Sequence, residues 1–125
     1  MDKSKFSGTG VAVVTPFHSD LSVDYDSLGE LIEFLITSGI NYLVAMGTTG
    51  ESPTISVSEK EKIFKFFVQQ NKGRVPLIMG IGGNDTRAIQ EALERVDPSG
   101  FDAILSVSPY YNRPTQEGIY QHYNA

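Results

Sequence analysis

Four short apolar runs recur along the chain, and segments with helical periodicity lie between them. The runs are rich in Val, Ile, Leu and Ala and occupy residues 11–14, 42–46, 77–79 and 103–107. Their spacing of about thirty residues is typical of a βα unit. Strands that are apolar throughout and alternate with amphipathic helices favour a parallel sheet covered by helices. The sequence therefore predicts an α/β fold.

Each segment between the runs carries apolar side chains on one helical face. The faces are formed by Leu28, Leu31, Ile32 and Leu35, by Ile63, Phe66 and Phe67, and by Ala88, Ile89, Ala92, Leu93 and Val96. Residues 56–59, Ser-Val-Ser-Glu, have the capping-box pattern that begins a helix. Gly39 and Gly73 lie where the first two helices are expected to end.

The length of the chain limits how this pattern can close. A fourth helix begins after residues 115–118, and the sequence ends at Ala125 within it. A (β/α)8 barrel needs about 250 residues, so four strands cannot form one. We predict that residues 1–125 are the N-terminal half of one TIM-barrel domain, with an incomplete fourth helix and no separate second domain. A self-contained, flavodoxin-like four-stranded sheet is the structural alternative.

Composition excludes several classes of partner and site. The net charge is −5 and Lys and Arg form no cluster, which argues against nucleic acid or a membrane surface as partner. The absence of cysteine excludes disulfides, thiolate metal sites and cysteine nucleophiles. His18 and His122 have no metal-site spacing, and we expect no metal. The N-terminal residues lack a secretory signal core, so a cytoplasmic location is expected.

Polar and glycine-rich segments follow the predicted strands. They are Thr15-Pro16 and residues 47–50, 80–84 and 108–111. In a parallel α/β fold the carboxyl ends of the strands meet at one edge, and that edge carries the site. We therefore expect the functional residues to come from these segments.

The segment Gly47-Thr48-Thr49-Gly50-Glu51, called the threonine turn below, is the most informative of them. Its glycines allow a tight turn with exposed N–H groups, and its threonines add two hydroxyl donors. Such a turn suits a small carboxylate or a carbonyl oxygen. An ordinary strand-to-helix turn is the alternative interpretation.

Tyr110 and Tyr111 follow the fourth run and would lie beside the threonine turn if all four strands are neighbours. A threonine and a tyrosine can together relay a proton, although packing aromatics are the alternative. Residues 80–83, Gly-Ile-Gly-Gly, resemble a phosphate loop, but a dinucleotide motif requires glycine where Asp85 stands. No lysine lies in or at the end of a predicted strand, so no Schiff-base lysine is visible.

Four motifs taken together resemble one family. They are VAVVTPF at residues 11–17, GTTGES at 47–52, GIGGN at 80–84 and SPYYNRPTQEG at 108–118. In this order and spacing, from about Thr9 to the last residue, the chain resembles the dihydrodipicolinate synthase family of pyruvate-dependent aldolases, which includes N-acetylneuraminate lyase. The sequences GTTGE and YYNRP favour the synthases over their relatives.

The resemblance implies a barrel enzyme in which a lysine forms a Schiff base with pyruvate. The resulting enamine attacks L-aspartate 4-semialdehyde in the first committed step of lysine synthesis, without metal or organic cofactor. It implies that Thr48 joins a proton relay and that Thr49 holds the pyruvate carboxylate. Tyr111 would complete the relay across a homo-oligomer interface, in a dimer or tetramer, with Tyr110 beside it.

The resemblance also implies what this chain lacks. The Schiff-base lysine belongs to the second half of the family's barrel, so residues 1–125 alone are expected to be inactive. Ser52, Lys60, Asn84 and Tyr110 are candidates for the family's feedback site for lysine. This chain has Lys60 and Ala88 where inhibited members carry histidine and glutamate, so lysine inhibition is not expected. The alternatives are another 2-keto acid aldolase of the family and a non-catalytic half barrel that assembles with another chain.

Overall fold

The computed structural model describes residues 3–125, which contain one parallel four-stranded sheet. The strands are β1 (Gly10–Ala12), β2 (Tyr42–Ala45), β3 (Leu77–Gly80) and β4 (Ala103–Leu105), and all three pairings are parallel. The predicted first, second and fourth runs extend one or two residues beyond the observed strands, which end at Ala12, Ala45 and Leu105. The prediction of an α/β parallel sheet is confirmed.

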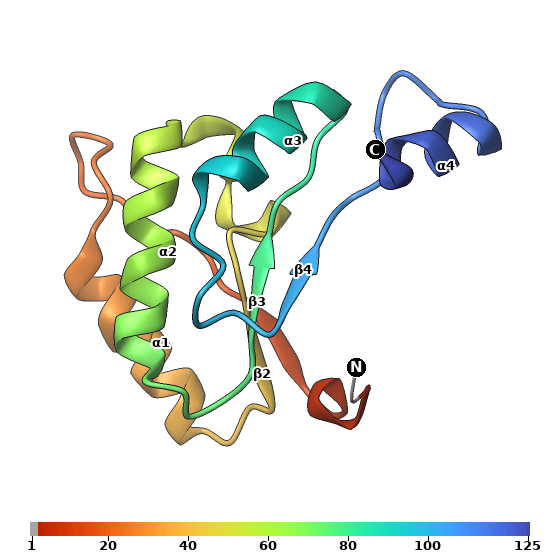
Figure 1. The fold of residues 1–125 in the computed structure, drawn as a ribbon. Coiled ribbons are helices and arrows are strands. Elements are labelled where there is room, and N and C mark those ends of the chain that lie inside the picture. Colours follow the sequence, from red (N-terminus) through yellow and green to blue (C-terminus); the bar gives the residue numbers. More distant parts are fainter. Residues whose placement is uncertain (1–2) are drawn as a thin grey trace.

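The strand order decides between the two predicted topologies. The order across the sheet is β1-β2-β3-β4, the same as in the sequence. A flavodoxin-like sheet reverses direction after its first strand and carries helices on both faces. Here the helices α1 (Tyr25–Thr37), α2 (Val57–Asn71) and α3 (Thr86–Arg95) all cover one face, and each strand follows its predecessor in one direction (Figure 1). Sequential order with helices outside is the arrangement of a (β/α)8 barrel, of which four units are present.

Four α-helices are present within residues 3–125, and the second begins at the capping box that the sequence indicates. They are α1 (Tyr25–Thr37), α2 (Val57–Asn71), α3 (Thr86–Arg95) and α4 (Gln116–Asn124), with short 3₁₀ turns at Lys3–Phe6, Thr48–Gly50 and Ser52–Thr54. Ser56 and Glu59 form the predicted capping box of α2, and Asp85 caps α3. These caps satisfy amide groups that a helix start leaves unpaired.

The core lies between the sheet and the inner faces of α1 and α2. Its fully buried side chains come from both layers: Leu28, Ile32, Leu43, Ile63, Phe67, Leu77 and Met79. In all, the predicted helical faces supply the helix side of this layer, and the second and third runs supply the sheet side. Burial of these apolar side chains fixes β2 and β3 at the centre, and with them the loops at their ends.

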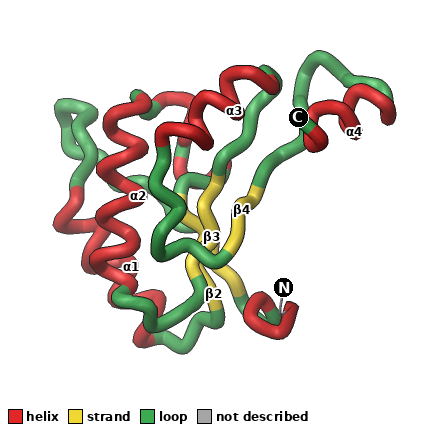
Figure 2. Tube along the Cα trace, viewed as in Figure 1, coloured by secondary structure: helices red, strands yellow, loops and turns green. Residues whose placement is uncertain are grey.

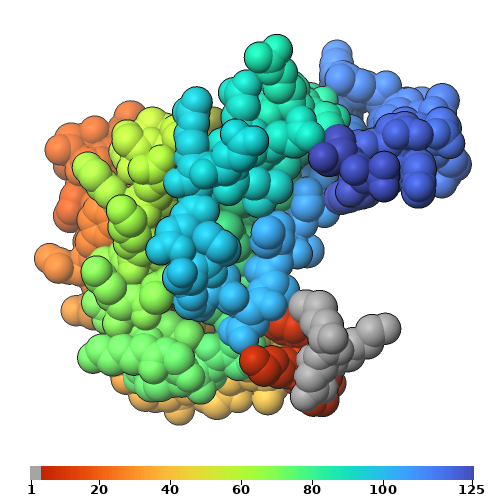
Figure 3. All heavy atoms as spheres, viewed as in Figure 1, coloured from red at the N-terminus to blue at the C-terminus, as the bar shows by residue number. Residues whose placement is uncertain are grey.

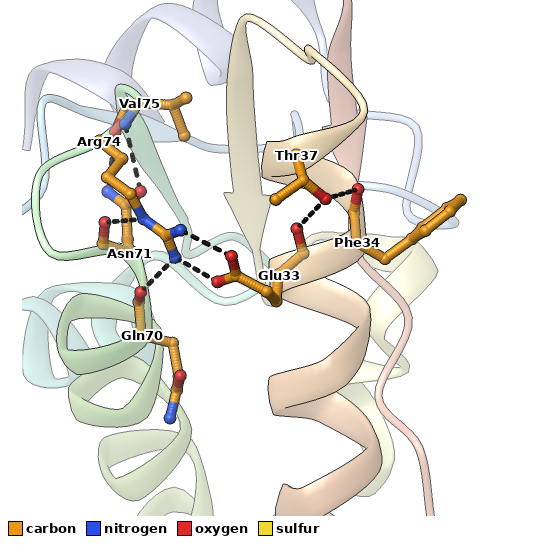
Figure 4. A network of polar contacts seen from close by, with 7 residues as sticks. All are labelled: Glu33, Phe34, Thr37, Gln70, Asn71, Arg74 and Val75. Carbon is orange, nitrogen blue, oxygen red and sulfur yellow. Dashed lines mark hydrogen bonds and ion pairs between the residues drawn. The ribbon is translucent and has the colours of Figure 1, made fainter.

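A polar cluster joins α1 to α2 at the end of the sheet opposite these loops. The Arg74 guanidinium donates to both carboxylate oxygens of Glu33, at 3.0 and 2.7 Å, and also to the Gln70 and Asn71 carbonyls (Figure 4). Hydrogen bonds from Arg74 lower the pKa of the Glu33 carboxyl. The buried Asn71 side chain donates to the Val75 carbonyl and accepts from the Val75 amide. This cluster ties α1 to the end of α2, and it lies on the side of the molecule opposite the candidate site.

The fourth strand lies at an open edge. Ile104, Leu105 and Val107 are each about half exposed, at 51%, 52% and 44%. The helix α4 does not cover them; it stands off from the body and leaves a recess beside β4 (Figure 3). It is tied to α3 by a 2.7 Å hydrogen bond between Thr86 and His122. Within residues 3–125 no helix is long and apolar enough to cross a bilayer.

Candidate active site

The polar segments that follow the strands lie at one edge of the sheet. Figure 2 shows the loops that leave β2, β3 and β4 running on from the same ends of the strands. The parallel register aligns Ala45 with Met79 and Gly80 with Leu105, which brings these loops side by side. The expectation that residues 47–50, 80–84 and 108–111 follow strand ends at a common edge is confirmed.

A cavity of about 310 Å³ opens at this edge. It is lined by Met46, Gly47, Thr48 and Ser52 after β2, by Gly80, Ile81 and Gly82 after β3, and by Leu105 and Val107 of the β4 end. Its wall is largely apolar, with the Thr48 hydroxyl as a hydrogen-bonding group. Among the residues that the structure describes, no lysine lines it. The cavity suits a small ligand that is fixed by a few polar contacts.

The threonine turn is a 3₁₀ turn with its two threonines exposed and its two glycines buried. The amides of Gly50 and Glu51 donate to the carbonyls of Gly47 and Thr48, at 2.9 and 3.1 Å. The amides of Thr48 and Thr49 come first in the turn, so the turn itself gives them no acceptor. Thr48 and Thr49 are thus two adjacent exposed residues whose hydroxyls and amides the turn leaves available as donors, and such donors suit a carboxylate.

The backbone around this turn is held in an uncommon conformation. Met46 and Glu51, immediately before and near the end of the turn, have positive φ angles of 57° and 56°. Residues other than glycine seldom adopt this region, and it persists only where neighbours enforce it. Gly80 is one such neighbour, because a Cβ added there would lie 2.4 Å from the Met46 carbonyl oxygen. The ends of β2 and β3 therefore approach more closely than side chains would allow.

We predict that Gly80→Ala destabilises the protein by about 3 kcal/mol, because the new methyl group overlaps backbone atoms that cannot move without disturbing β2. The measurement is the urea midpoint of unfolding of the whole gene product that carries residues 1–125. Gly29→Ala is the matched control, since an added Cβ meets its nearest neighbour at 3.4 Å. A helical Gly-to-Ala change of this kind is stabilising by up to about 1 kcal/mol. Equal midpoints for the two variants would contradict the close approach at Gly80.

The tyrosines lie apart from the threonine turn within a single chain. Tyr111 is 93% exposed and has a φ angle of 68°, and Tyr110 is 49% exposed. They follow β4, and β3 separates that strand from β2. In the part of the chain described, no hydrogen bond joins either tyrosine to Thr48 or Thr49. The Tyr111 side chain is thus directed outward, where a second subunit could meet it.

Three of the four feedback-site candidates surround a second cavity of about 300 Å³. Ser52, Lys60 and Asn84 line it together with Ala88, between α2 and α3, whereas Tyr110 does not. Burial lowers the pKa of the Lys60 ammonium. Of the charged residues that line this cavity, Asp85 uses its carboxylate to cap α3. The cavity wall therefore presents the Lys60 ammonium, and at position 88 it has an alanine and no carboxylate.

Sequence reasoning missed two residues that shape the site. It identified Thr15 only as a polar residue after a strand and Gly80 only as part of a tight turn. In the structure the buried Thr15 hydroxyl donates to the Gly50 carbonyl at 2.7 Å. Gly80 makes room for Met46. A glycine at the end of an apolar run is a usable signal for close backbone approach. The Thr15 contact has no such signal in the sequence.

Comparison with known proteins agrees with this geometry. The model of the dihydrodipicolinate synthetase family matches residues 5–125. A 4-hydroxy-tetrahydrodipicolinate synthase from Parabacteroides distasonis is 52% identical over 118 residues, 94% of this chain and 40% of that protein. The crystal structure of the chloride-inhibited dihydrodipicolinate synthase from Acinetobacter baumannii complexed with pyruvate is 46% identical with a TM-score of 0.88, over 93% of this chain and 40% of its own.

A more distant neighbour marks the breadth of the likeness. The N-acetylneuraminate lyase of Mycoplasma synoviae is 29% identical with a TM-score of 0.85, over 96% of this chain and 42% of its own. The chain thus spans about two fifths of the relatives it matches. Because those relatives are TIM barrels, the prediction of half a barrel is confirmed. The family match over nearly all of its residues shows that this chain belongs to the dihydrodipicolinate synthetase family.

Proposed function

We propose that the protein carrying this chain is a 4-hydroxy-tetrahydrodipicolinate synthase of lysine biosynthesis. It condenses pyruvate with L-aspartate 4-semialdehyde through a lysine Schiff base, and residues 1–125 form the N-terminal half of its one barrel domain. The observation that carries the proposal is the threonine turn at the mouth of a small cavity, in a chain 52% identical to a named synthase.

The residues of this chain have distinct roles in the proposed reaction. Thr49 holds the pyruvate carboxylate by its hydroxyl and amide; the residue is exposed and lies in the middle of the turn, which supports this role. Thr48 lines the cavity, and it passes protons between the bound substrate and the relay. The nucleophilic lysine, whose amine forms the Schiff base with the pyruvate carbonyl, comes from sequence outside these residues.

Tyr111 extends the relay into the site of a neighbouring subunit. Its side chain is 93% exposed in the single chain, which supports a role at an interface between copies. Tyr110 lies beside it at the same interface. The proposed enzyme is accordingly a homo-oligomer, in which each subunit completes its neighbour's relay.

The test is the rate of condensation by the whole gene product with pyruvate and L-aspartate 4-semialdehyde. We expect turnover with this pair and none in the cleavage of N-acetylneuraminate. The opposite preference would assign the protein to the lyases of the family. No activity with either substrate, together with self-association, would favour the non-catalytic half barrel, whose open β4 edge exposes apolar side chains.

Feedback by lysine is expected to be absent. The second cavity presents the Lys60 ammonium and has Ala88 where a carboxylate would be needed to pair with a cationic ligand. Like charges at short range disfavour binding. We predict that the initial rate of the whole gene product is unchanged in excess L-lysine. Strong inhibition by lysine would show that another acidic group serves this cavity and would overturn the prediction.

A further inference from the structure

The threonine turn needs an anchor because its backbone is strained at both ends. Met46 and Glu51 have φ angles of 57° and 56°, in the left-handed region that favours glycine. Such conformations are retained only where surrounding contacts enforce them. Gly80 lets the ends of β2 and β3 approach at Met46. It has no side chain, so it cannot form a side-chain hydrogen bond to the far end of the turn. The Glu51 carbonyl accepts hydrogen bonds from the Thr54 amide and hydroxyl, both at 2.9 Å. A separate contact must hold the turn at Gly50.

Thr15, in the segment that follows β1, supplies that contact. Its side chain is 6% exposed, and its hydroxyl donates to the Gly50 carbonyl oxygen at 2.7 Å. Only Thr15 and Asn71 are buried polar residues within residues 3–125. Asn71, the last residue of α2, pairs with the backbone of Val75 four residues on, whereas Thr15 bonds a residue 35 positions along the chain. The bond therefore joins the segment that follows β1 to Gly50 of the turn.

The space around Gly50 is too tightly packed for another group to take the place of the Thr15 hydroxyl. Gly50 is itself buried, and a Cβ added there would lie 3.2 Å from the Val13 carbonyl oxygen and 3.4 Å from the Thr15 hydroxyl oxygen. The turn is thus packed directly against the segment that carries Thr15. Without the hydroxyl, a buried carbonyl would lose a donor, and the strained backbone would be free to relax.

We propose that Thr15 is a positioning residue for the carboxylate site at Thr48 and Thr49. Its hydroxyl does not touch substrate; it fixes the turn so that the two threonine hydroxyls and amides converge. This inference rests on the proposed function for its catalytic readout. It also predicts a local effect on the turn that does not depend on activity.

The first test uses the whole gene product and the variants Thr15→Val, which removes the donor at nearly constant shape, and Thr15→Ser, which keeps it. We expect Thr15→Val to raise KM for pyruvate about tenfold and to leave KM for the aldehyde substrate unchanged. Thr15→Ser should stay within about twofold of the parent. The matched control is Thr37→Val, because the Thr37 hydroxyl also bonds backbone carbonyls but lies at the end of α1.

The split between the two KM values separates positioning from stability. A merely structural Thr15 would reduce the amount of folded enzyme, and so the apparent kcat, without changing either KM. An unchanged KM for pyruvate in Thr15→Val would overturn the proposal. If that variant is insoluble, Thr15→Ala gives the same comparison.

Hydrogen exchange tests the inference even if the protein proves not to be a synthase. The amides of Gly50 and Glu51 close the turn, so their exchange should accelerate at least tenfold in Thr15→Val and not in Thr15→Ser. The Leu43 amide, which donates to the Pro76 carbonyl in the core, is the internal control. Equal exchange at Gly50 and Glu51 in all variants would overturn the anchoring role. Absence of synthase activity with accelerated exchange would overturn only the proposed function.

Discussion

Residues 1–125 expressed alone will form no product from pyruvate and L-aspartate 4-semialdehyde, whereas the whole gene product will turn over. The physical reason is the composition of the site. The cavity at the threonine turn is lined by apolar groups, glycines and hydroxyls, and no lysine lines it among the residues that the structure describes. The chain also spans only two fifths of its relatives.

The measurement is the condensation rate at equal molar concentrations of the two proteins. Circular dichroism and size-exclusion chromatography establish whether residues 1–125 fold and how they associate. The open edge at Ile104, Leu105 and Val107 makes association expected. Turnover by the isolated residues at a rate near that of the whole protein would show that the catalytic groups all lie within them, contrary to the proposed function.

Replacement of Thr48 by valine will lower kcat of the whole gene product by about a hundredfold or more, the usual contribution of a positioned proton-transfer group. Valine retains the shape of threonine, so the cavity wall and the turn should keep their form. Thr48 is exposed, and its hydroxyl bonds no other described residue. The loss should therefore appear in catalysis and leave the free energy of unfolding almost unchanged.

Thr48→Ser is the matched control, because it restores the hydroxyl and should recover most of the activity. Initial rates at saturating concentrations of both substrates give kcat for each variant. A normal kcat in Thr48→Val would remove the residue from the relay. Equal loss in the valine and serine variants would point to the methyl group, and thus to packing.

Much of the fold could be predicted because its signals are local. Ser56 and Glu59 are three residues apart, and their capping box begins α2 as the sequence indicates. The apolar runs also located all four strands, since a strand of a helix-covered parallel sheet carries a continuous apolar pattern. The threonine turn was recognisable because a strand end, two glycines and two hydroxyls are adjacent in sequence.

The contacts that shape the site could not be predicted, because they join distant residues. Nothing near Thr15 in the sequence indicates that its hydroxyl reaches Gly50. The positive φ angles of Met46 and Glu51 were equally hidden, since neither residue type favours that conformation. The exposure of Leu105 and Val107 depends on what covers the fourth strand, and a local apolar pattern does not contain that information.

The most direct test of the central claim is to trap pyruvate on the protein with borohydride and to locate the adduct by peptide mass spectrometry. Reduction of a lysine Schiff base leaves a stable secondary amine at the reacting residue. The account predicts one pyruvate adduct per subunit of the whole gene product, on a lysine outside residues 1–125, and reduced trapping when Thr49 is replaced by valine. An adduct on Lys60 or another lysine of this chain, or no adduct in an active enzyme, would contradict it.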